Sequence, residues 1–275
     1  YRIFTILYDK SLPIPTTSIP EQGDVHPFIS VNVDYVPLNE HIIIMYCGTA
    51  CNNHYVGSYE CGGNKNLLGA DGNFDTDSLL AWGQRCHEVG ADMWYWYYPV
   101  NYGSMLCDAP NITNIYHDIK FLVENCYVTG VNYEGFYWQG YQFEYLKSHL
   151  AAEVMWSVQY DENGNMSMMT EKEFHEEIKE YLYLFYGDGY EYVYEYLLMY
   201  EAAADALDTH EKEQGRKTSC YVNNHDRPGD NFSYYYWQDN YLEMRELLLK
   251  AIELADTTPY GEAWWDASQA QFADT

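Results

Sequence analysis

The sequence predicts an α/β fold in which a parallel β-sheet of four strands is followed by a region made only of helices. Up to residue 140, short runs rich in β-branched and aromatic residues alternate with helix-like segments. This spacing is typical of βα units and favours parallel pairing of the strands. Beyond residue 140, apolar residues recur with the helical period. The chain therefore divides near residue 145 into an α/β region, 1–145, and a helical region, 146–275.

Each expected element has its own local signal. Strands are expected at 1–8, 41–47, 91–98 and 130–138, and helices between the later strands at 77–89 and 114–124. Thr170 and Glu173 form a capping-box pattern, which predicts a helix that begins there and ends near Gly187. Further helices are expected at 146–156, 190–207 and 241–255.

Composition and charge narrow the classes of partner. The 275 residues are 47% hydrophobic, enough to fill a core, and 14 Lys and Arg stand against 42 Asp and Glu, a formal charge of −28. Phosphate backbones and anionic membrane surfaces would repel such a chain, so nucleic acid is not expected as a partner. No apolar run approaches the ~20 residues that span a bilayer. Because a strand is expected at the first residue, we expect a piece of a longer protein.

Two sets of residues suggest metal sites and fail on spacing. The loop 71–77 alternates oxygen side chains as a calcium loop does, but its sixth position is Thr76 and its twelfth is Trp82. A polar loop that caps the next helix is the expected alternative. Cysteine and histidine cluster between strand and loop, at Cys47, Cys51, His54 and Cys61. Their spacing lacks the second ligand pair of a zinc site, so neither a metal nor a cofactor is expected.

Two further motifs have ordinary structural interpretations. His175 and the glutamates after it resemble part of a zinc-binding helix, yet Lys179 stands where the second histidine is needed, so a solvated helix face is expected. Residues 111–113 form a formal glycosylation acceptor, Asn-Ile-Thr, and are expected to open the following helix instead.

Polar and aromatic residues gather at the carboxyl ends of the predicted strands. They are Asp9, then Asn52, Asn53 and His54, then Tyr98 and Asn101, then Trp138 and Gln139. In a parallel αβ barrel the loops after the strands converge on one face, where ligands bind. Amide and imidazole groups hydrogen-bond hydroxyls, and aromatic faces suit the apolar side of a sugar ring.

The stretch "MWYWYYPVNY", residues 93–102, carries six aromatic rings in ten residues. Strand alternation predicts two sets: Met93, Tyr95 and Tyr97 on one face, and Trp94, Trp96 and Tyr98 on the other. One set is expected to pack under the helices while the other lines the interior of a barrel. For any single ring, ordinary core packing is the competing interpretation.

The order of several motifs resembles the bacterial domain of unknown function 4838, a family similar to α-glucuronidase and β-hexosaminidase barrels. The resemblance covers about residues 1–207, and the motifs that carry it are 47–54, Trp82, "WYYPVNY", Pro110 with Asn111, "GFYWQG", "YLKSHLAAEVMW" and "YGDGYEYVYEYL". The resemblance implies the C-terminal half of a (β/α)8 TIM-type barrel, strands 5–8 of a longer parent, followed by a helical region. It also implies a secreted or cell-surface protein whose partner is an oligosaccharide or polysaccharide.

The sequence departs from the family at two acids. Members tend to read Trp-Asp-Tyr where this chain has Tyr97 in the middle position, and Glu-Gln-Gly where it has Trp138 in the first. Glycoside hydrolysis normally needs two carboxylic acids, and Glu134 and Asp9 are the remaining catalytic candidates. Glu134 could equally be a structural acid paired with an arginine or amide. A hydrolase, a non-catalytic carbohydrate-binding protein and a surface interaction protein therefore all stay open.

Overall fold

The computed structural model of the chain describes residues 3–8, 39–47, 56–57, 79–99, 110–135, 143–213 and 240–255. The chain forms two compact units. The sheet unit comprises 1–50, 56–98 and 120–134, and the helical unit comprises 51–55, 99–119 and 135–275. Each unit is described by itself.

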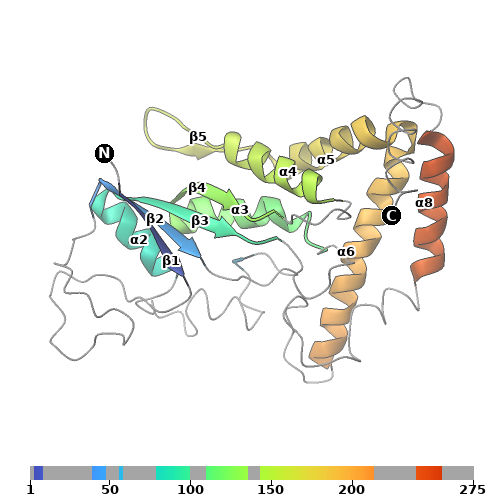
Figure 1. Cartoon of the computed structure of the whole chain (residues 1–275), viewed down its shortest axis with the longest axis horizontal. Helices are drawn as coiled ribbons and strands as arrows, with labels where there is room; N and C mark the ends of the chain where they lie inside the picture. The colour runs from blue at the N-terminus through green and yellow to red at the C-terminus, as the bar shows by residue number, and fades with distance from the viewer. Residues whose placement is uncertain are drawn as a thin grey trace, which may run out of the picture. The chain divides into compact units, whose positions relative to one another are not determined.

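A parallel β-sheet forms the centre of the sheet unit (Figure 1). Its strands are β1 (Ile3–Tyr8), β2 (Ile42–Cys47), β3 (Asp92–Tyr97) and β4 (Val128–Tyr133). They lie side by side in the order of the sequence, and all three pairs are parallel. The α/β class and the parallel pairing predicted from the sequence are confirmed. Within the described residues the sheet is open, with β1 and β4 at its edges.

Two helices follow the strands of this sheet, α2 (Leu79–Val89) and α3 (Asn114–Cys126). Parallel crossovers are right-handed, so strands added always in one direction place their helices on one face of the sheet. A Cβ added to Gly83 of α2 would lie 2.2 Å from the backbone oxygen of Cys126, so the two helices are in direct backbone contact. The described sheet is therefore covered by neighbouring helices on one face.

The apolar stripes of these helices explain their packing. Leu79, Trp82 and Cys86 are buried at helical spacing in α2, which gives way to Gly90 in a left-handed conformation, φ 73°. In α3 the side chains with no exposed surface recur in the same way: Ile115, Ile119, Leu122 and Cys126. Burial raises the pKa of both cysteine thiols to about 12.

The helical unit contains the helices expected from the 3.6-residue period. They are α4 (Glu144–Trp156), α5 (Glu171–Tyr186), α6 (Tyr190–Glu213) and α8 (Tyr241–Ala255). The predicted capping box is present: the Thr170 side chain accepts from the Glu173 N–H, and the Glu173 carboxylate accepts from the Thr170 N–H. Between α4 and α5, a short hairpin pairs β5 (Gln159–Tyr160) with β6 (Met166–Ser167).

A single 3-10 turn, η1 (Gly187–Gly189), connects α5 to α6. A Cβ on Gly189 would lie 2.4 Å from the backbone oxygen of Ala251, so α8 packs directly against this turn. The core of the unit includes Phe174, Ile178 and Leu182 of α5. Among the helices that the structure describes, none has the length and hydropathy needed to cross a membrane.

Candidate functional site

Strand β3 separates its rings onto two faces, as the sequence alternation predicted. Met93, Tyr95 and Tyr97 are 0%, 1% and 4% exposed. Trp94 and Trp96, which point to the other side, are half-buried, and so is Tyr98 just beyond the strand. The chain therefore buries one set of rings completely and leaves the other set partly accessible.

The parallel register gives the half-buried rings their neighbours on the adjacent strands, which are buried on β2. Trp94 and Trp96 are paired with Met45 and Cys47 of β2, and with Gly130 and Asn132 of β4. We use the term ring-bearing face for the residues whose side chains contact one another here: Phe4, Cys47, Trp94, Trp96, Tyr98 and Glu134. Cys47, Tyr98 and Glu134 lie at the carboxyl ends of β2, β3 and β4.

The rings of this face are packed against one another. Trp96 and Tyr98 are stacked, with centroids 5.6 Å apart and planes 10° apart. Phe4 of β1 meets Trp94 edge-on, with centroids 5.7 Å apart. A Cβ on Gly130 would lie 2.7 Å from the Trp94 indole, so the absence of a side chain at position 130 lets that indole lie on β4.

Glu134 lies at the carboxyl end of β4 and is joined to the rings. The Trp96 Nε1–H donates to Glu134 Oε2 at 2.8 Å, and the Glu134 backbone N–H donates to Tyr97 O at 2.8 Å. The Trp96 indole therefore holds the carboxylate beside the Trp96 and Tyr98 stack. Its placement beside the rings agrees with strand alternation, while its catalytic role stays a prediction.

Tyr98 and Cys47 are the other two polar groups of the ring-bearing face. The Tyr98 hydroxyl and the Cys47 thiol are 3.2 Å apart and share a hydrogen bond, which fixes the phenol over the end of β2. Cys47 is buried and forms no disulfide. The remaining members of the zinc pattern, Cys51, His54 and Cys61, lie outside the described residues.

The other predicted site residues also lie outside the described part of the chain. They are Asp9, Asn52, Asn53, His54, Asn101, Trp138 and Gln139. Of the predicted set, the structure thus places Tyr98 and Glu134, and it brings both to Trp96. The hydrogen-bonding role of Trp96 and the need for glycine at position 130 were not predicted. The alternation that places both residues on one face was their only signal.

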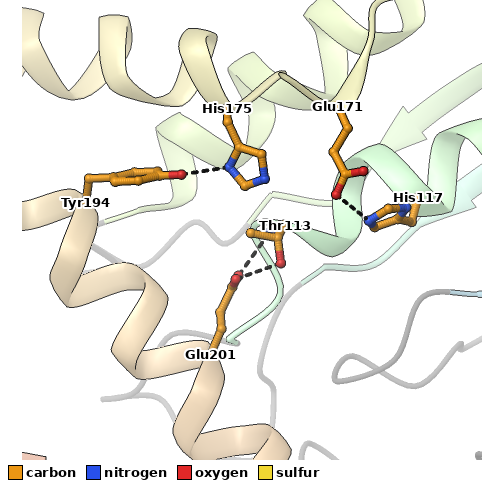
Figure 2. A network of polar contacts seen from close by, with 6 residues as sticks. All are labelled: Thr113, His117, Glu171, His175, Tyr194 and Glu201. Atoms are coloured by element: carbon orange, nitrogen blue, oxygen red, sulfur yellow. Dashed lines mark hydrogen bonds and ion pairs between the residues drawn. The ribbon is translucent and has the colours of Figure 1, made fainter. Parts of the chain in front are cut away.

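Polar side chains also gather in the helical unit, where α3, α5 and α6 meet. Figure 2 shows the six that form this polar cluster: Thr113, His117, Glu171, His175, Tyr194 and Glu201. Glu201 of α6 accepts two hydrogen bonds from Thr113, from its N–H at 2.9 Å and its hydroxyl at 2.7 Å. Burial raises the pKa of Glu201, and the Thr113 hydrogen bonds and the charge of Lys147 oppose this. The carboxylate caps the start of α3, where negative charge is favoured.

Two histidines complete the polar cluster (Figure 2). His117 Nε2 lies 3.4 Å from Glu171 Oε1, and the Tyr194 hydroxyl is 2.8 Å from His175 Nδ1. Burial lowers the pKa of His175, the Glu171 charge opposes this, and Lys179 and His117 lower it further. The predicted solvated face is exposed at Glu176, whereas His175 is half-buried because Tyr194 of α6 contacts it. Because these contacts join α3, α5 and α6, we interpret the polar cluster as a set of packing contacts that hold these helices together.

The remaining motifs are placed as follows. Asn111 is 3% exposed in the turn that directly precedes α3, which begins at Asn114, and its side chain is not accessible to a glycan. Within the described residues, no three metal-ligating side chains lie close enough to share an ion.

Comparisons of this chain with protein-family models, with curated proteins and with solved structures give no match. The resemblance to domain of unknown function 4838 therefore rests on the motifs alone and stays a prediction.

Proposed function

We propose that this chain is the C-terminal half of a (β/α)8 barrel and that its ring-bearing face binds an oligosaccharide or polysaccharide. The observation that carries this proposal is the Glu134 carboxylate, held by the indole of Trp96 next to the stacked ring of Tyr98. A carboxylate beside two stacked rings offers a sugar both a hydrogen-bond acceptor for its hydroxyls and a flat surface for its C–H face.

The sheet supports the barrel part of the proposal. A barrel wall adds each strand beside the previous one and covers its outer face with helices, while side chains fill its interior. Strand order β1-β2-β3-β4 has this property, and the half-buried rings lie on the face opposite the fully buried set. A doubly wound sheet would instead reverse its strand order at a switch point.

The position of Glu134 beside the rings makes it the candidate for acid catalysis. Glu134 is the candidate acid, and hydrolysis needs a second carboxylic acid, for which Asp9 is the sequence candidate. In that arrangement the rings hold the sugar while the two carboxyl groups act on the glycosidic oxygen and the anomeric carbon.

A non-catalytic carbohydrate-binding or surface interaction protein is the second candidate. One observation favours it: among the described residues at the ends of β2, β3 and β4, Glu134 is the only acid. Tyr97, which stands at a family aspartate, is 4% exposed on the opposite face. A carboxylate at position 97 would therefore not reach the ring-bearing face.

Binding and hydrolysis are tested together on the full chain with a panel of plant and host oligosaccharides. Thermal unfolding measures binding, because a ligand at 100 times its Kd stabilises the folded state by about 2.7 kcal/mol. Released reducing ends measure hydrolysis. Binding and release, with release lost in Glu134→Gln at unchanged stability, support the hydrolase. Binding without release supports a non-catalytic carbohydrate-binding protein. Neither binding nor release contradicts both saccharide functions and is the result expected of a surface interaction protein.

A further inference from the structure

The carboxylate of the ring-bearing face lies where a ligand on the rings would meet it. Among the six residues of this face Glu134 is the one carboxylic acid, and the Trp96 indole holds it beside the stacked Trp96 and Tyr98 rings. Glu134 and both rings are half-buried, so a sugar that packs on the rings also meets the carboxylate. The charge of the ligand therefore decides how well this face accepts it.

The basic side chains of the sheet unit lie on its helices. Its described residues include two Lys or Arg side chains, Arg85 and Lys120. Arg85 of α2 pairs with Glu88 at 3.3 Å, and Lys120 of α3 pairs with Glu124. Arginine and lysine are the usual partners of a bound carboxylate or sulfate. Within the described residues, the ring-bearing face thus offers no such cation to an acidic sugar.

The sequence that follows each strand of the sheet is acidic as well. The segments 9–38, 48–78, 98–113 and 134–143 each begin at the carboxyl end of a strand. Together they contain ten Asp or Glu, two Lys and no Arg. The potential at this end of the sheet is therefore expected to be negative, which attracts cations and repels anions.

The ring stack and the carboxylate together suit a sugar that carries a positive charge. As a refinement that rests on the proposed function, we propose that the ring-bearing face binds an amino sugar whose free ammonium group pairs with Glu134. An ammonium group donates to a carboxylate with full charges on both partners, which a hydroxyl cannot do. The same cation is attracted by the faces of Trp96 and Tyr98.

The other charge classes of saccharide fit this face less well. A neutral sugar still packs on the rings and donates hydroxyl hydrogen bonds, but it gains no attraction between opposite charges. A uronic acid brings a second carboxylate close to Glu134, and two like charges in a half-buried site are unfavourable. On one sugar backbone, the affinity should fall from amino sugar to neutral sugar to uronic acid.

Three trimers that share the linkage of cellulose test the proposal, one each of glucosamine, glucose and glucuronic acid. Isothermal titration of the full chain at about pH 6 measures each Kd. Salt at about 0.15 M screens non-specific attraction beyond about 8 Å. The glucosamine trimer should bind about tenfold more tightly than the glucose trimer, as expected for one hydrogen bond between charged groups. The glucuronic acid trimer should not bind.

Two glutamine variants locate the charge that makes this selection. Glu134→Gln keeps the acceptor for the Trp96 indole and removes the charge, so the glucosamine and glucose trimers should bind it nearly equally. Glu40→Gln is the matched control, because Glu40 is an exposed acid in the turn before β2, at the amino end of the sheet. It should keep the tenfold preference.

The outcomes separate this proposal from the proposed function. A glucose or glucuronic acid trimer that binds as tightly as the glucosamine trimer would overturn the amino-sugar assignment and leave the saccharide function standing. Equal losses in Glu134→Gln and Glu40→Gln would overturn it too, because the trimer would then follow the general negative charge of the chain. If no trimer binds, the amino-sugar assignment is wrong, and the panel of plant and host oligosaccharides decides the proposed function alone.

Discussion

The indole nitrogen of Trp96 donates a hydrogen bond of 2.8 Å to the carboxylate of Glu134, and so joins β3 to the end of β4. The donor belongs to a ring stacked on Tyr98, and the acceptor is the one described acid at the carboxyl ends of β2, β3 and β4. Ring and carboxylate therefore hold a fixed orientation relative to each other before any ligand arrives. Such preorganisation reduces the entropy lost when a ligand binds.

Trp96→Phe should separate the ring from its hydrogen bond. The variant keeps an aromatic surface but leaves the part-buried Glu134 carboxylate without its indole donor. We expect the free energy of unfolding to fall by about 1–3 kcal/mol in urea denaturation. Glu134→Gln is the control, because the amide oxygen still accepts from the indole, and it should stay near wild type. Wild-type stability in Trp96→Phe would show that this hydrogen bond contributes little.

Gly130→Ala should displace the Trp94 ring of the ring-bearing face. The new Cβ would lie 2.7 Å from the Trp94 indole, which must tilt or move away. We expect a loss of about 1–3 kcal/mol in the free energy of unfolding. A double-mutant cycle with Trp94→Leu checks the cause, because the smaller side chain should recover much of the loss. Additive effects of the two substitutions would exclude the clash.

Tyr97→Asp should unfold the protein more readily without creating activity. Tyr97 is 4% exposed and lies with Met93 and Tyr95, so the substitution buries a carboxylate on the fully buried face. An uncompensated buried charge costs about 3–5 kcal/mol. Tyr98→Asp, at a half-buried position of the other face, should cost less. Thermal unfolding measures both. A stable Tyr97→Asp variant that gains hydrolytic activity would contradict the assignment of the two faces.

The pH dependence of stability should depend on His175. Burial lowers the pKa of this imidazole below its usual 6.5, so the folded protein favours the neutral form. A base with a lowered folded-state pKa contributes stability above the unfolded-state pKa, and this is lost as the pH falls through about 6.5. The charge of Glu171 limits the effect, and those of Lys179 and His117 increase it.

His175→Gln should therefore lose less stability than wild type when thermal unfolding is compared at pH 7.5 and pH 5.5. His87→Gln is a control at an exposed histidine in α2 and should keep the wild-type dependence. Equal pH dependence in wild type and His175→Gln would show that another group titrates in this range.

Local signals in the sequence predict most of the described fold. The runs of β-branched and aromatic residues give three strands to within two residues, whereas the fourth, expected at 130–138, is Val128–Tyr133. The alternation in 93–98 also gives the orientation of each ring, because successive side chains in a strand point to opposite faces. The Thr170 and Glu173 pair marks the start of α5, because a capping box satisfies the backbone donors of the first turn locally.

Contacts between distant segments could not be predicted in the same way. Trp96 reaches Glu134 only because the β3–β4 register shifts at Met93 and Trp94, and nothing local in the sequence specifies such a shift. The neighbours of His175 in the sequence are charged and suggested a solvated face. The contact that partly buries His175 comes from Tyr194 of the following helix, which these neighbours do not reveal. Thr113 and Glu201 are 88 residues apart and meet only through the packing of α6 on the start of α3.

The central claim is that the ring-bearing face binds a saccharide, and the most direct test is the thermal shift that a bound oligosaccharide produces in three proteins. Wild type and Tyr145→Ala should both be stabilised by the same oligosaccharide, because Tyr145 is an exposed residue of α4 and is not part of the ring-bearing face. Trp96→Ala should show a clearly smaller shift than both of these proteins at the same concentration. If no oligosaccharide of the panel stabilises wild type, or if Trp96→Ala is stabilised as much as wild type, the ring-bearing face is not the binding site.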